Sequence, residues 1–162
     1  MEVGVTVQPV PRSYTDEELI DIVSAVYCGA EIASSPMAVV NQRGPTSVVS
    51  DFGNNAGLLV GPEIPDWSSL PPNTLSATVT VDDIIVGDVS VDTIAAGPLQ
   101  ALRFLIGHCG RRGIELSSGT LISTGAVTGV HDVRLSSKAR VDYGSLGWFD
   151  VTFTPMQIRH AL

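Results

Sequence analysis

The chain has 162 residues, of which 44% are hydrophobic and only 16% charged, a composition that excludes a disordered chain. Its length predicts one domain that covers residues 1–162 and buries a core of its own. Nine Lys and Arg against seventeen Asp and Glu leave a net charge of −8. Since nucleic acids and anionic membranes both bind clustered positive charge, we expect neither as a partner.

No targeting or membrane segment is visible in the sequence. Its first residues lack the basic and apolar regions of a secretory signal. No apolar run approaches the roughly 20 residues of a membrane span. We therefore expect a cytoplasmic protein, in whose reducing surroundings Cys28 and Cys109 are small buried hydrophobes rather than a disulfide.

The first elements predicted along the chain are a strand, a helix and a second strand. Residues 2–7 form a Val-rich strand pattern. Thr15 and Glu18 have the spacing of a capping box, which predicts the start of a helix. This helix would continue through Cys28 to Gly29 and bury one apolar face, made of Leu19, Ile22, Val23 and Val26.

The middle of the chain predicts short strands around a long irregular segment. Residues 37–40 and 56–61 are short apolar runs. Residues 41–55 between them are rich in Gly, Ser and Asn and long for a loop, which often marks a functional segment.

The second half predicts a hairpin, a helix and further strands. Asp82-Asp83 between two Val- and Ile-rich runs predicts a tight hairpin. Pro98 begins a second helix, which contains Cys109 and ends at Gly110 or Gly113. The remaining predicted strands cover residues 121–124, 138–143 and 148–153. Many short strands with two helices predict an α+β fold, mostly β, with a rolled or sandwiched sheet that carries its helices outside.

Glu31 is the most informative residue, because it is an acid in a run of small and apolar residues. A carboxylate in such a run either costs several kcal/mol or has a partner that offsets its desolvation. The simplest partner without a nearby base is a hard cation such as Mg²⁺ or Mn²⁺. Glu2 is a second isolated acid, and the two would form a cation site if their strands lie side by side. The alternative is that Glu2 is a solvated terminal acid and Glu31 a strand-edge acid.

Two polar segments could complete such a site. The Asn54-Asn55 turn is one, and Thr124-Gly125 is the other, with a hydroxyl and an accessible backbone N–H for a substrate carboxylate. A bound cation would polarise a carbonyl and stabilise an enolate, as reactions of 2-keto acids require. His131 could reach the mouth of this pocket, although histidines more often decorate a surface.

Several short motifs follow one another along nearly the whole chain. They are Tyr14-Thr15-Asp16-Glu17-Glu18-Leu19, Gly29-Ala30-Glu31-Ile32, Asn54-Asn55-Ala56-Gly57, Gly97-Pro98-Leu99, Ser123-Thr124-Gly125 and Gly147-Trp148. In this order they resemble the fumarylacetoacetate hydrolase superfamily, and within it the branch of 2-keto-4-pentenoate hydratases and 4-oxalocrotonate decarboxylases.

The resemblance implies a β-sandwich roll with two short peripheral helices and a Mg²⁺ or Mn²⁺ site. Glu2 matches the second acid of the family's Glu-x-Glu pair, and Glu31 matches its third metal ligand. The first acid of the pair would precede Met1, and we expect the chain to lack the N-terminal segment typical of the hydratases. Asn54 stands where the family has an acid, and Ser35 lies in Ser-Ser-Pro where the family has Asp-Ser-Arg. Two carboxylates would bind Mg²⁺ roughly 10–100-fold more weakly than three.

Three hypotheses for the function follow. The first is a lyase, namely a hydratase, decarboxylase or C–C hydrolase, that acts on a small 2-keto or 2-hydroxydienoate acid through a metal-stabilised enolate. Its catalytic residues would be Thr124 and Asp51, with Asp51 or an ordered water moving protons. Its substrate would contact Ser35, Asn54, Asn55 and Gly125.

The second hypothesis is a metal-independent cyclase or isomerase of a biosynthetic pathway on the same fold. The third is a non-catalytic subunit that pairs with a longer paralogue. The first two predict a homo-oligomer.

Overall fold

The computed structural model describes residues 1–71, 74–91 and 97–155. In chain order its elements are β1 (Glu2–Val3), α1 (Asp16–Ile22), β2 (Val23–Ala25), β3 (Tyr27–Ala33), η1 (Val40–Arg43), α2 (Pro45–Ser50), η2 (Phe52–Asn54), β4 (Asn55–Glu63), η3 (Trp67–Ser69), β5 (Leu75–Val81), β6 (Ile84–Val91), α3 (Pro98–Arg112), β7 (Lys138–Asp142), η4 (Gly144–Leu146) and β8 (Trp148–Thr152).

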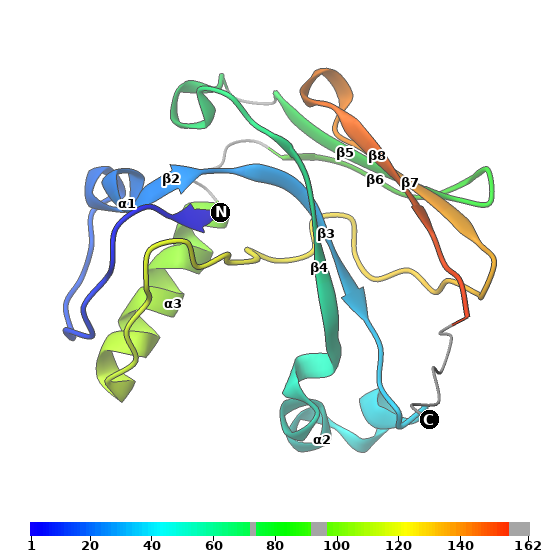
Figure 1. Cartoon of the computed structure of the whole chain (residues 1–162), viewed down its shortest axis with the longest axis horizontal. Helices are drawn as coiled ribbons and strands as arrows, with labels where there is room; N and C mark the ends of the chain where they lie inside the picture. The colour runs from blue at the N-terminus through cyan, green and yellow to red at the C-terminus, as the bar shows by residue number, and fades with distance from the viewer. Residues whose placement is uncertain (72–73, 92–96, 156–162) are drawn as a thin grey trace, which may run out of the picture.

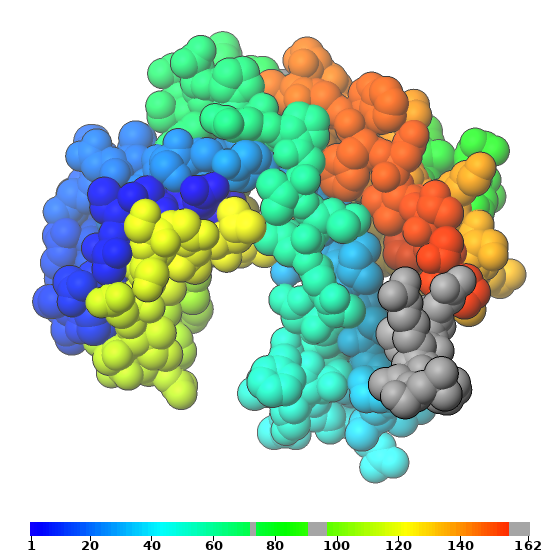
Figure 2. Space-filling view, in the orientation of Figure 1, coloured from blue at the N-terminus to red at the C-terminus, as the bar shows by residue number. Residues whose placement is uncertain are grey.

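The elements form an arch (Figure 1). One end is a lobe of β1, β2, α1 and α3, the other is the sheet β6-β5-β7-β8, and the antiparallel pair β3–β4 runs between them. Helix α2 lies at the far tip of this pair. The space-filling view in Figure 2 shows the arch hollowed between α3 and β4.

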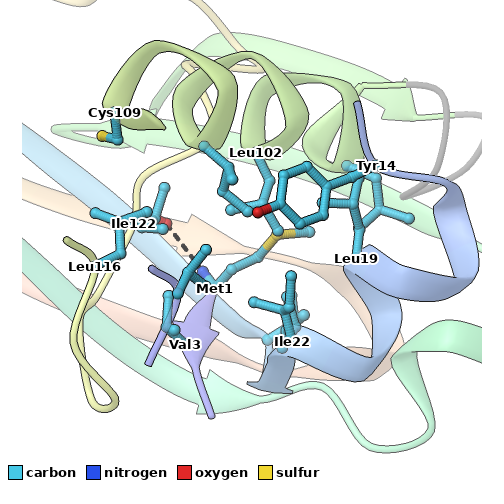
Figure 3. Packing of buried hydrophobic residues seen from close by; sticks show 14 of the residues in the cluster. Met1, Val3, Tyr14, Leu19, Ile22, Leu102, Cys109, Leu116 and Ile122 are labelled. Carbon is cyan, nitrogen blue, oxygen red and sulfur yellow. Dashed lines mark hydrogen bonds between the residues drawn. The ribbon is translucent and has the colours of Figure 1, made fainter. Parts of the chain in front are cut away.

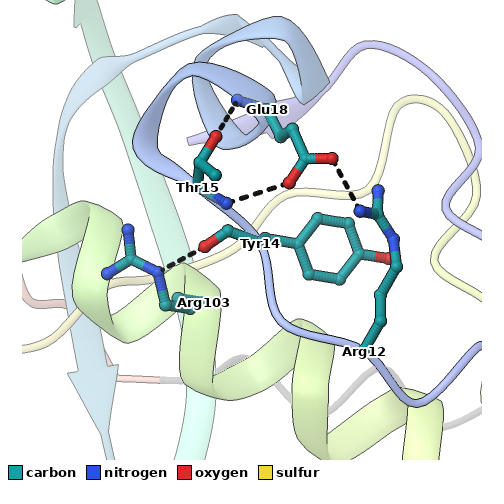
Figure 4. A network of polar contacts seen from close by, with 5 residues as sticks. All are labelled: Arg12, Tyr14, Thr15, Glu18 and Arg103. Carbon is teal, nitrogen blue, oxygen red and sulfur yellow. Dashed lines mark hydrogen bonds and ion pairs between the residues drawn. The ribbon is translucent and has the colours of Figure 1, made fainter.

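Helix α1 begins with the predicted capping box (Figure 4). Glu18 N donates to Thr15 Oγ1 at 3.3 Å, and Thr15 N donates to Glu18 Oε2 at 2.9 Å, so two backbone donors of the first turn are satisfied. Arg12 also donates to Glu18, at 2.6 Å, and its guanidinium lies over the Tyr14 ring. Arg103 Nε donates to Tyr14 O at 3.0 Å, which ties α3 to this segment.

The helix that was predicted to reach Gly29 ends at Ile22, so that prediction is wrong. The next three residues form β2, which pairs antiparallel with β1 through Val23 and Val3. Burial along β2 alternates with period two, as in a half-buried strand. Apolar residues here suit a helix face or a strand, and the β-branched side chains together with pairing to β1 favour the strand. Cys28 therefore lies in β3 rather than in a helix.

Residues 37–40 do not form the predicted strand. They lie in bends and turns that lead into η1. The segment 41–55, predicted to be irregular, contains most of η1, all of α2 and η2 and the first residue of β4. Pro45 is the first residue of α2, where its fixed φ and missing N–H are tolerated.

Two further predicted strands, over residues 2–7 and 121–124, are shorter or absent in the structure. The strand predicted over residues 2–7 is limited to β1, with a further isolated bridge between Val7 and Leu116. Residues 121–124 form no strand, and Leu121 makes only a single bridge to Glu2. Because β1 has only two residues, it offers no ladder for a longer partner.

The predicted hairpin is confirmed as β5–β6. Asp82 and Asp83 connect the strands with φ of 47° and 66°, the positive values that a two-residue type I′ turn requires. Strand β7 adds to the other edge of β5, and β8 adds to β7, all antiparallel. The second helix begins at Pro98 as predicted, and Gly113 caps its end with φ of 68°.

Two contacts join the β3–β4 pair to the four-stranded sheet. An ideal Cβ on Gly61 would lie 2.5 Å from Cδ1 of Phe149, so the glycine lets the ring pack directly on β4. The Tyr143 hydroxyl donates to Gly29 O at 2.6 Å. These contacts position β3 beside the sheet.

The main core lies in the lobe that contains α1 and α3 (Figure 3). Its N-terminal strand is fastened to the segment after α3, because Met1 N donates to Ile122 O at 3.0 Å and Ile122 N donates to Met1 O at 2.8 Å. Cys28 and Cys109 are both free and buried, as predicted. The most deeply buried large side chains are Leu19, Leu99, Leu102, Ile106, Val3 and Cys28.

The predicted α+β class, mostly β, is confirmed by antiparallel sheets that carry short helices. Helix α2 is an addition to the two predicted helices. No helix within the described ranges has both the length and the apolar character needed to cross a membrane.

Candidate functional site

A cavity of about 600 Å³ lies against β3–β4 and one face of the four-stranded sheet. The segment 121–133, which leads from the α3 lobe toward β7, lines it as well. The volume falls within the range of about 300–1,000 Å³ typical of small-molecule sites.

The wall that the four-stranded sheet contributes is apolar. Alternate residues of β5, β7 and β8 face the cavity, because successive side chains of a strand point to opposite faces. The lining residues from these strands include Ala77, Val79, Val81, Ala139, Val141 and Val151.

Five of the residues predicted for the site line this cavity. Glu31 is an exposed residue of β3, opposite Leu58 of β4. The others come from three separate segments, although up to 94 positions (125 − 31) separate them from Glu31 in the sequence. The five residues are Glu31, Ser35, Asn54, Thr124 and Gly125.

Three predicted site residues are not part of the cavity wall. Glu2 is half-buried in β1, where one carboxylate oxygen accepts a hydrogen bond from the Tyr27 hydroxyl at 2.9 Å. Asp51 caps the C-terminal end of α2. Asn55 is exposed at the start of β4. Glu2 thus contacts two residues of the cavity wall, Tyr27 through this hydrogen bond and Leu121 through a β-bridge.

The acids of this region suit a hard cation in type but are few in number. Among the described residues, no cluster of three or more His, Cys, Asp or Glu side chains could hold a metal ion. Two carboxylates, Glu31 and Glu2, can serve Mg²⁺ where water and substrate complete the coordination. The hydrogen bond from Tyr27 to Glu2 is of the kind that orients a ligating carboxylate. In type these carboxylates suit a hard cation, but of the two only Glu31 lines the cavity.

Two tyrosines of the cavity wall have a raised pKa. For Tyr27 the main cause is its hydrogen bond to Glu2, and desolvation adds to it. Desolvation by burial raises the pKa of Tyr143. Both phenols therefore stay protonated at neutral pH and act as hydrogen-bond donors. Burial raises the pKa of the Cys28 thiol to about 11, so this thiol is an inert part of the core.

Two buried polar atoms of the cavity wall have no hydrogen-bond partner among the described residues, namely Asn54 Oδ1 and His131 Nε2. Asn54 Nδ2 donates to Asn41 Oδ1 at 3.0 Å, which orients the amide. The His131 ring packs on β6, where an ideal Cβ on Gly87 would lie 2.6 Å from Nε2. Asp51 Oδ2, away from the cavity wall, is a third such atom. Buried polar atoms are normally paired, so the position beside Asn54 Oδ1 suits a bound ligand or an ordered water.

Three further residues of the cavity wall were not predicted as site residues, namely Tyr27, Asn41 and Tyr143. Tyr27 was missed because the predicted helix ran to Gly29 and so placed it outside the strand of Glu31. Asn41 and Tyr143 come to the site through tertiary contacts, and no local pattern signals either of them.

No protein-family model matches the chain, and no curated protein matches it. Two solved structures of the 4-oxalocrotonate decarboxylase from Pseudomonas putida G7 are similar to it. The one complexed with calcium and acetate has a TM-score of 0.72 and 20% sequence identity, over 94% of this chain and 58% of that chain. The one complexed with magnesium and adipate has a TM-score of 0.72 and 22% identity, over 94% of this chain and 59% of that chain.

The chain thus spans less than two thirds of the length of these decarboxylase chains. At this level of identity the similarity concerns the three-dimensional fold. The chain has the fold of the 4-oxalocrotonate decarboxylase, which is the fold that the ordered motifs implied.

Proposed function

We propose that the protein is a lyase-type enzyme, a hydratase, decarboxylase or C–C hydrolase, that acts on a small 2-keto or 2-hydroxydienoate acid. The observation that carries the proposal is the convergence of Glu31, Asn54 and Thr124 on one largely apolar cavity. Apolar walls with a few convergent polar groups are the usual form of a small-molecule site. The fold shared with a solved decarboxylase supports the same class of reaction.

The residues of the site would have different roles in the reaction. Glu31, with Glu2 behind Tyr27, would hold Mg²⁺ or Mn²⁺, which when bound would stabilise an enolate. The hydroxyl of Thr124 and the backbone N–H of Gly125 would donate to the substrate carboxylate.

The remaining polar groups would orient substrate and move protons. The free acceptor Asn54 Oδ1 would take a hydrogen bond from substrate, and the hydroxyl of Ser35 would be a further polar contact. Asn55 would act through the turn that positions Asn54. Asp51, which is not in the cavity wall, would move protons through an ordered water.

Loss of the ultraviolet absorbance of a 2-hydroxydienoate tests the proposal. We expect Glu31→Gln to lower kcat/KM by at least about 100-fold, in line with the loss of a group that acts in the transition state. Glu17→Gln is the matched control, because Glu17 is an exposed acid of α1 outside the cavity wall. Equal activity of both variants and the parent protein would refute the assignment of Glu31.

A metal-independent cyclase or isomerase on the same fold is the second candidate. It is favoured by the position of Glu2, whose carboxylate contacts Tyr27 and is not part of the cavity wall. Turnover that EDTA leaves unchanged and Mn²⁺ does not increase would select this candidate over the first.

We also propose a homo-oligomer, since large apolar side chains such as Phe52 (89% exposed) and Phe104 (70% exposed) lie on the surface. A non-catalytic subunit that pairs with a longer paralogue is the alternative. Sedimentation of the purified chain tests both, because a stable homo-oligomer with turnover excludes a dependent subunit.

A further inference from the structure

We infer that the cavity selects a substrate with one polar head and an extended apolar arm, and rejects acids that carry a second carboxylate. The inference rests on the proposed function only in taking this cavity as the substrate site. It concerns the part of the cavity that the proposed polar contacts leave unused.

The four-stranded sheet gives the cavity a largely apolar wall, and the proposed polar groups come from other segments. The groups proposed to meet the head, including Glu31, Asn54 and Thr124, come from β3, the end of η2 and the segment after α3. The wall from the four-stranded sheet presents mainly Val and Ala side chains such as Val79 and Val141, beside Ser76. A ligand that filled both parts would therefore be polar at one end and apolar at the other.

The charges of the wall set the second condition. Its described residues include two acids, Glu31 and Asp132, and no lysine or arginine. A carboxylate placed against the apolar sheet wall would lose its hydration without a lysine or arginine of the described wall to pair with, which is costly. A second carboxylate on the substrate arm is thus disfavoured.

The size of the cavity sets the third condition. A volume of about 600 Å³ suits a ligand of drug-like size, larger than a short keto acid alone. Each methylene of an arm buried against Val79, Val141 and their neighbours is expected to contribute about 0.8 kcal/mol, which is about 4-fold in affinity. An alkyl or aryl arm therefore fits the space that a short head group leaves empty.

The test measures binding without turnover. Butanoate, hexanoate, octanoate and adipate are titrated against the protein with the neutral fluorophore N-phenyl-1-naphthylamine in the cavity, with Mg²⁺ and with EDTA. We expect the Kd of the monoacids to fall by about 4-fold for each added methylene. We expect hexanoate to bind at least about 10-fold more tightly than adipate, which differs from it by one terminal carboxylate.

A variant that adds a positive charge to the cavity wall tests where the substrate arm lies. Val133 lines the cavity and is 39% exposed, so Val133→Arg can be accommodated without repacking the core. This variant should improve adipate binding and bring the ratio of the two Kd values close to one, whereas Val133→Met, the apolar control, should keep the ratio of the parent protein.

Three results would overturn the inference: affinity that does not change with chain length, adipate that binds as tightly as hexanoate, or a ratio that Val133→Arg leaves unchanged. Failure of the proposed function is a separate result. It would be seen as a normal chain-length series in a protein that turns over no keto or enol acid.

Discussion

The lobe around α3 and the space beside the four-stranded sheet are built from the same kinds of apolar side chain, yet one is filled and the other is hollow. In the lobe, Val3 is 1% exposed and Leu102 is fully buried among residues of α1, β1 and α3. In the sheet, Val141 is 6% exposed, but it borders a cavity of about 600 Å³.

The filled lobe contributes mainly to stability, whereas the hollow region has the features of a binding site. Close packing in the lobe gives each buried methyl group contacts on all sides, so its removal leaves a new void. On the sheet wall the void already exists, and the side chains there have lost part of that contact energy. A protein that leaves such a space unfilled, beside a group of polar side chains, has the form of a binding site.

A matched pair of valine truncations is expected to give the largest effect. Val3→Ala should lower the free energy of unfolding by about 2–3 kcal/mol, because it removes buried methyl groups and leaves a cavity. Val141→Ala should cost only about 1 kcal/mol, because the space beside it is already open. Denaturant unfolding measures both values, and equal losses would contradict the contrast between a filled and a hollow region.

A change at Gly87 tests how the cavity wall holds His131. A Cβ at this position would lie 2.6 Å from His131 Nε2, so Gly87→Ala should destabilise the protein by about 1–2 kcal/mol through overpacking. The double variant Gly87→Ala/His131→Ala should recover part of that loss, because the ring is gone but Thr128 Cβ would still lie 2.9 Å from the added Cβ. Additive losses in this double-mutant cycle would show that the two residues do not contact each other.

The smallest effect is expected at Tyr143, whose hydroxyl contacts β3. Tyr143→Phe removes the hydrogen bond from the hydroxyl to Gly29 O, which should cost about 1 kcal/mol. Burial raises the pKa of Tyr143, so its stabilising contribution is present below the ordinary tyrosine pKa of about 10 and is lost as the pH rises through the higher folded value.

Unfolding measured from pH 7 to pH 11 tests this dependence. The difference in unfolding free energy between the parent protein and Tyr143→Phe should stay constant up to about pH 10 and then decrease. A difference that grows with pH would contradict the assigned direction of the pKa.

Local chemistry explains which parts of the fold were predictable. The capping box at Thr15 and the turn at Asp82-Asp83 depend on neighbouring residues, so both were predicted correctly. The end of α1 was not, because the apolar residues after Ile22 suit either a helix or a strand, and pairing with β1 decides between them. The strand predicted at Leu121 does not form for a similar reason, because its potential partner β1 has only two residues.

The candidate site also has residues that the sequence indicated and residues whose position depends on tertiary packing. Glu31 was singled out because an acid is unusual in an apolar run, Thr124 because its hydroxyl precedes a glycine, and both line the cavity. The position of Glu2, held by Tyr27 outside the cavity wall, depends on how β1 and β3 pack. The contact of His131 with Gly87 joins a loop to β6, and neither residue carries a local signal of it.

The central claim is that the cavity beside β3 and the four-stranded sheet binds the substrate. The most direct test is a difference map from a crystal grown with Mn²⁺ and a 2-keto acid that carries an alkyl arm. We expect the acid head between Glu31 and Thr124, an anomalous peak at the Glu31 carboxylate, and the arm along Val79 and Val141. A cavity that contains only solvent, with the acid bound elsewhere on the protein, would contradict the claim.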